Sequence, residues 1–148
     1  MKKFRFALET VLSYKQQVLE ALQGEQAAIN AQVHQQEELL EDLKARYERD
    51  GAEYRTRCAE GMEIRMALAW QAALRARERE IEEETRQLVV LRKQAEEKRQ
   101  EVVAAKQDTS SIEKLREKQL GSYNAAAAKS EEQFIEEFVS SRRGSQGA

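Results

Sequence analysis

The sequence of 148 residues has no proline, one cysteine, one histidine and only 6% aromatic residues. Because proline interrupts helices most strongly, its absence leaves the six glycines as the clearest places for a helix to end. One cysteine cannot form an intramolecular disulfide, and one cysteine with one histidine cannot assemble a metal site. We therefore expect no intramolecular disulfide, no metal and no cofactor.

Long apolar runs are also missing. No stretch approaches the roughly 20 apolar residues that span a bilayer, so the sequence does not predict an integral membrane protein. The first residues, MKKFRFALETVL, begin like a secretory signal, but Glu9 interrupts the apolar run and no small-residue cleavage site follows. We expect a cytoplasmic protein that is peripheral to the membrane at most.

Catalytic and nucleic-acid-binding patterns are absent as well. The 25 basic and 27 acidic residues are interspersed, whereas binding to nucleic acid needs a basic face. We find no GxxxxGK[ST] phosphate loop and no GxGxxG, HExxH or GxSxG motif. We therefore expect no nucleic-acid partner, no enzyme activity and no catalytic residue.

What the chain does contain is a heptad seam, in two parts. Steps of four and three residues from Leu8 to Tyr54 give fourteen positions, of which ten are apolar or aromatic. The same steps from Ala67 to Ile112 again give ten apolar positions in fourteen, counting alanine. Polar seam residues such as Gln26 either leave the seam partly solvated or fix its register.

The two seams meet at a stretch bounded by Gly51 and Gly61, where the chain can reverse. We predict a single all-α domain, a long two-helix antiparallel coiled coil whose second helix is longer than the first. The expected bounds are about 6–53 for the first helix, about 54–63 for the turn and about 64–141 for the second helix. Residues 142–148 are expected to be a disordered tail.

The register of the hairpin has two solutions. If the numbers of facing residues sum to about 124, Leu22 faces Val102 and the polar Gln26 faces Lys98. A sum near 117 instead places Leu43 opposite Leu74. The first register matches polar with polar more often, and a slip of one heptad is the alternative.

In either register the residues after about 120 extend beyond the first helix, and they include several apolar side chains. Such an unpartnered apolar stretch is either a binding surface or a frayed helix end. At the other terminus, Phe4 and Phe6 stand among three cations, which oppose the macrodipole of a helix. An acidic partner and contact with anionic lipid are both open explanations.

The opening KKFRFALETVLSYKQQVLEALQGE resembles the start of FliJ-family proteins of the flagellar type III export apparatus. The resemblance continues through the glycine-bounded midpoint, Trp70 and Leu74, and the late segments IEKLREKQLGSY and EEQFIEEFV. It implies a non-enzymatic central stalk that binds the hexameric export ATPase and couples it to the export gate membrane protein. It also implies a place at the cytoplasmic face of the inner membrane at the flagellar base, with an ATPase regulator and export chaperones as further partners.

Two sets of residues follow from this resemblance together with the apolar pattern. The residues expected to bind the ATPase are Phe4, Phe6, Leu120, Tyr123, Phe134 and Phe138. The residues expected to contact the export gate are Trp70, Leu74 and Arg77. Two other functions stay open: a coiled-coil adaptor or export chaperone that holds substrates or a scaffold partner, and a homodimeric rod of parallel helices.

Overall fold

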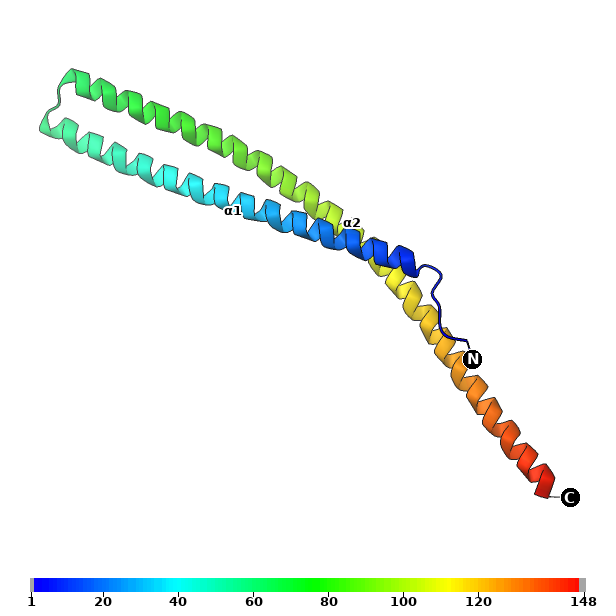
Figure 1. Cartoon of the computed structure of the whole chain (residues 1–148). Helices are drawn as coiled ribbons and strands as arrows, with labels where there is room; N and C mark the ends of the chain where they lie inside the picture. The colour runs from blue at the N-terminus through cyan, green and yellow to red at the C-terminus, as the bar shows by residue number, and fades with distance from the viewer. Residues whose placement is uncertain (1, 147–148) are drawn as a thin grey trace. The chain divides into compact units, whose positions relative to one another are not determined.

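The computed structural model describes residues 2–146 and forms two helices from them (Figure 1). Helix α1 spans Glu9–Glu60 and helix α2 spans Ile64–Gln146, so the second helix is the longer one. The two helices pack against each other as a hairpin, and residues 2–146 contain no strand. This confirms the predicted fold class.

The heptad steps identify the buried side of both helices. Every α1 position from Leu12 to Tyr54 and every α2 position from Ala67 to Ile112 in the predicted seam is buried or half-buried. The residues of the seam with less than a tenth of their surface exposed are Leu12, Leu40, Leu43, Leu88, Leu91, Val102 and Thr109. Thr109 is the polar member, and its hydroxyl is satisfied because it donates to the carbonyl oxygen of Ala105 at 2.8 Å.

Of the two hinge glycines, only Gly61 ends a helix. Its φ of 101° lies in the region that L side chains avoid, and its N–H donates to the carbonyl oxygen of Cys58 at 3.2 Å. This is the glycine cap expected after a helix carboxyl end. Gly51 instead stays inside α1, so the predicted helix end near 53 is seven residues too early and the link between the helices is only residues 61–63.

The outer helix ends also differ from the predicted ones. Residues 2–6 have no regular structure and α1 begins at Glu9 rather than near 6, which puts an acidic side chain in its first turn. At the other terminus α2 continues to Gln146, although the sequence predicts disorder from 142. Arg143 in the last turn complements the helix macrodipole there. Residues 147–148 lie outside the described residues.

The chain divides into two compact units. Unit 2 is residues 21–102, in which α1 and α2 pair up to the turn (Figure 1). Unit 1 combines residues up to Glu20 with residues from Val103 onward. It contains the first turns of α1, the segment before them and the carboxyl-terminal part of α2.

Contacts within each unit support the 124 register. In unit 2 the Lys98 Nζ atom lies 2.7 Å from Glu25. Glu25 directly precedes Gln26, the residue that the 124 register places opposite Lys98. In unit 1 the Arg116 Nε atom lies 2.9 Å from Glu9. The numbers of both pairs sum to about 124, so the register with a sum near 117 is wrong.

Candidate interaction surfaces

In unit 1 the segment before α1, residues 2–8, packs along α2, and we call it the amino-terminal strap. The Tyr123 hydroxyl donates to the carbonyl oxygen of Lys2 at 2.6 Å. The ring of Phe4 lies 5.6 Å from that of Tyr123, and the Arg116 guanidinium stands 5.7 Å from the Phe4 ring. Phe6 is only 7% exposed. The strap is therefore a packed element.

The sequence pattern explains why the strap is not helical. Phe4, Phe6 and Leu8 alternate with polar or small residues, and a period of two suits an extended chain. Lys2, Lys3 and Arg5 would be unfavourable in the first turn of a helix. The helix begins only where the acidic Glu9 follows.

The strap changes the surface that the sequence predicts. Leu120 and Tyr123 are half-buried in unit 1, so the expectation that they lack an intramolecular partner is wrong. Phe4 and Phe6 likewise pack within the unit rather than standing free. The alternation of Phe4, Phe6 and Leu8 was the signal in the sequence that could have identified the strap.

Beyond the strap, α2 carries an exposed apolar tail, defined as Phe134, Ile135, Phe138 and Val139. These side chains are 69%, 56%, 57% and 44% exposed. Phe134 and Phe138 are four residues apart and therefore lie on one face of the helix. Every described residue from 128 to 145 is exposed. The Arg142 guanidinium of the same helix stands 5.8 Å from the Phe138 ring and leaves that ring more than half exposed.

The three residues predicted to meet the export gate lie together on α2 in unit 2, but on its seam side. All three are half-buried. Trp70 packs beside Tyr54 with ring centroids 6.1 Å apart, and Arg77 reaches Asp50 of α1 at 3.9 Å. A partner on this face would therefore also meet side chains of α1.

A groove beside these residues is made by Gly51. It has a volume of about 670 Å³ and lies in unit 2. Its lining is Tyr47, Glu48, Gly51, Ala52, Tyr54, Arg55 and Leu74. Sequence reasoning treated Gly51 only as one boundary of the hinge and did not predict this groove.

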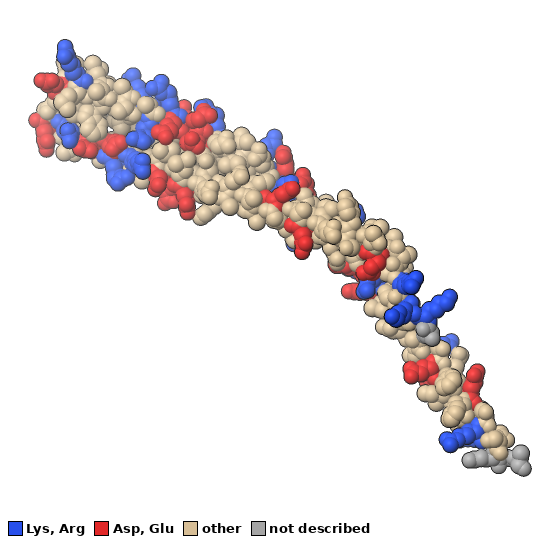
Figure 2. Space-filling model, in the orientation of Figure 1, with Lys and Arg blue, Asp and Glu red and all other residues tan. Residues whose placement is uncertain are grey.

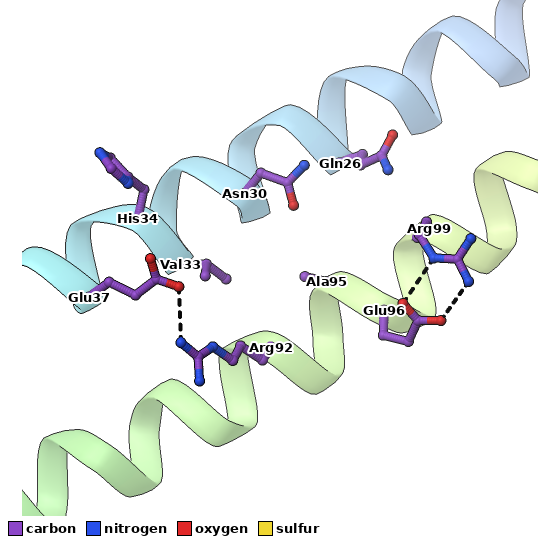
Figure 3. A pocket seen from close by; sticks show the side chains of 9 residues that line it. All are labelled: Gln26, Asn30, Val33, His34, Glu37, Arg92, Ala95, Glu96 and Arg99. Atoms are coloured by element: carbon purple, nitrogen blue, oxygen red, sulfur yellow. Dashed lines mark hydrogen bonds and ion pairs between the residues drawn. The ribbon is translucent and has the colours of Figure 1, made fainter.

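A second hollow in unit 2 lies where the seam side chains are short, at Val33 and Ala95 (Figure 3). Its charged groups are already paired: Arg92 with Glu37 at 3.1 Å, and Arg99 with Glu96. Hydrogen bonds from Arg99 hold the pKa of the Glu96 carboxyl below its usual value. His34 points away from the facing helix, as expected for a solvent-facing histidine (Figure 3). This hollow presents no unpaired reactive group.

Side chains of both charge signs are scattered over the visible face of the protein, and several lysine or arginine side chains lie near the turn of unit 2 (Figure 2). No group of three or more residues able to hold a metal ion occurs among residues 2–146. Cys58 is a free, exposed thiol. In the part of the chain that the structure describes, no helix is long and apolar enough to cross a membrane.

Comparison with known protein families identifies a match. A family model described as Flagellar FliJ protein matches residues 4–147, nearly the whole chain. Neither the curated proteins nor the solved structures contain a significant match.

Proposed function

The chain belongs to the FliJ family and is thus a component of flagellar protein export, and we propose that it acts there as the non-enzymatic stalk of the export ATPase. In this proposal the carboxyl-terminal part of α2 enters the pore of the ATPase hexamer. The chain also reaches the export gate protein through the face around Trp70, Leu74 and Arg77. It works at the cytoplasmic face of the membrane without crossing it.

The observation that supports the ATPase contact is the exposed apolar tail. Four large apolar side chains are solvent-exposed between residues 134 and 139, which is less than two turns of helix. The Arg142 guanidinium of the same helix stands 5.8 Å from the Phe138 ring, and all four side chains stay exposed. Such a surface is costly in water unless a partner buries it. An amphipathic helix that lays its apolar face against a hydrophobic groove of a partner is one of the recurring ways in which that burial is achieved.

The proposed coupling follows from symmetry. One helix inside a ring of six equal subunits cannot make the same contacts with all of them. If the helix binds one nucleotide state of a subunit more tightly than another, contact with the helix shifts that subunit toward the tightly bound state. The size of the shift is the difference between the two binding free energies. The stalk would therefore promote ring assembly and ATP hydrolysis without contributing a catalytic group.

The test is ATP hydrolysis by the cognate export ATPase with and without the chain. We expect the wild-type chain to raise the rate, and the variant Phe134→Ala with Phe138→Ala to reduce that increase by about fivefold or more, because the two rings supply most of the buried contact. Both rings are more than half exposed, so the folded chain should keep its stability.

The matched control is Val89→Ala with Val90→Ala, which removes an exposed apolar pair from unit 2. It should stimulate like the wild type. No stimulation by the wild-type chain would contradict the ATPase role.

An adaptor or chaperone that holds export substrates or a scaffold partner is the second candidate, since the same exposed tail could bind them. It predicts stable complexes in the absence of the ATPase, which a pull-down with purified components would detect. Stimulation of hydrolysis without such complexes would favour the stalk.

A further inference from the structure

The groove at Gly51 lies where the residue of α1 has no side chain to fill the space between its neighbours. Gly51 is helical and lies beside the seam residues Asp50 and Tyr54, where it contributes no side chain. A Cβ atom built there would meet only the Arg55 Nη1 atom, at 3.6 Å. The floor of the groove is therefore open backbone, flanked by Ala52.

Two tyrosines one heptad apart form its walls. The Tyr47 hydroxyl donates to Glu78, and the amide of Gln71 donates to the Tyr54 hydroxyl at 3.2 Å. The hydrogen bond to Glu78 raises the pKa of Tyr47 above its usual value, so the phenol stays protonated and held in place. Both rings are thus positioned by α2 before any partner arrives.

Outside the lining of the groove, one face of α2 runs from the two tyrosines toward the turn. Residues 64, 68, 71, 75 and 78 repeat at helical spacing and therefore share one face, the face that reaches the two tyrosines through Gln71 and Glu78. On this face Ile64 is 78% exposed and Leu68 is 59% exposed. Two exposed apolar side chains therefore lie on this face of α2, nearer the turn than the groove.

Charge around the groove indicates what covers it. Residues 44–79, KARYERDGAEYRTRCAEGMEIRMALAWQAALRARER, carry nine basic and six acidic side chains, a net charge of +3 in a chain of net charge −2. Arg55 lines the groove and Arg75 lies on the same α2 face. Neither makes an ion pair within the described residues, whereas Arg57 and Arg77 do.

We propose that the groove is a docking site for a helix of a partner protein that inserts one apolar side chain over Gly51 and presents carboxylates to Arg55 and Arg75. The inference rests on the proposed gate contact, because Leu74 belongs both to the predicted gate surface and to the lining of the groove. It adds the α1 residues of the groove to that gate surface. A third helix packed on two others fills such a gap with a single side chain. The carboxylates set its orientation and its rate of association.

Filling the groove is the direct test. Gly51→Leu should weaken binding of the purified cytoplasmic part of the cognate export gate protein about tenfold or more in calorimetry. The same variant should unfold at the same or a higher temperature, because leucine favours the helix more than glycine and a Cβ at this position meets the Arg55 Nη1 atom at an ordinary contact distance of 3.6 Å. Gly24→Leu is the control, since nothing lies within 4 Å of a Cβ there, and it should bind like the wild type.

The role of charge in docking is tested by comparing Arg55→Glu with Lys93→Glu, because both substitutions change the net charge of the chain by the same amount. Only Arg55→Glu should weaken gate binding about tenfold, and raising the salt concentration should weaken wild-type binding. Binding to phosphatidylglycerol vesicles that depends on Arg55 but not on Gly51 would assign the face to lipid and overturn the proposal.

Tight gate binding by Gly51→Leu would overturn the docking site and leave the gate contact and the ATPase role intact. Absence of gate binding by the wild-type chain would overturn both the gate contact and the docking site. Stimulation of the ATPase is measured separately and would stand in either case.

Discussion

At the scale of single residues, the same amino acid has opposite effects at two positions of this chain. Gly61 adopts a φ of 101°, which a side chain disfavours, and it caps α1. Gly51 is an ordinary helical residue, where glycine costs about 1 kcal/mol relative to alanine. Spacing alone does not distinguish the two, because both follow a long amphipathic segment and neither has a neighbouring proline.

Alanine substitutions should separate them. Gly51→Ala is expected to raise the free energy of unfolding by about 0.5–1 kcal/mol, through helix propensity and a restricted unfolded chain. Gly61→Ala should lower it by about 1–3 kcal/mol, because alanine is strained at positive φ. Urea denaturation followed by circular dichroism measures both, and equal effects of the two variants would contradict the assignment of the turn.

At the scale of elements, the strap decides how much of α2 is covered. It contacts α2 at Arg116 and Tyr123, and Tyr123 is half-buried there. The exposed apolar tail begins only after this cover ends. In unit 1 the apolar side of α2 therefore has two parts. The part at Tyr123 is covered by the strap, and the part at Phe134 and Phe138 is exposed and available to a partner.

Truncation of the buried Phe6 side chain should release the strap from α2. Phe6 is 7% exposed, so Phe6→Ala loses its apolar burial while the adjoining helices keep theirs. We expect trypsin to cleave after Arg5 about tenfold faster in this variant than in the wild type, because local opening governs cleavage. Phe134→Ala, a truncation of an exposed ring, serves as the control and should leave this rate unchanged.

At the scale of the whole molecule, α1 and α2 meet along the predicted seam positions within each unit, and neither unit encloses a fully buried side chain among the described residues. No described side chain has less than 2% of its surface exposed. Stability is consequently spread along the pairing of α1 with α2, as in other coiled coils. The register of that pairing is then what most determines which side chains remain available to partners.

A disulfide tests topology and register together. In a Cys58→Ser background, Leu22→Cys with Val102→Cys should form a crosslink within one chain, because the two positions face each other in the observed register of unit 2. Leu22→Cys with Ala95→Cys should not. Non-reducing gel electrophoresis distinguishes the products, and crosslinks only between chains would indicate the homodimeric rod instead.

The sequence by itself determined the helices and their buried sides. The four-and-three spacing from Leu12 to Tyr54 and from Ala67 to Ile112 specifies both, because a helix repeats its face at that interval whatever it packs against. It also contained the pattern of the FliJ family. Local spacing could not locate the helix ends, since ends depend on caps and on contacts made elsewhere in the chain.

Only the tertiary structure decided which side chains stay accessible. Burial of Tyr123 depends on a strap 121 residues away in sequence, and the groove at Gly51 exists because α2 places Leu74 beside it. Such contacts join positions that no local pattern connects. The structure therefore confined the free part of the predicted ATPase surface to Phe134 and Phe138, and gave the predicted gate surface an α1 side that the sequence did not indicate.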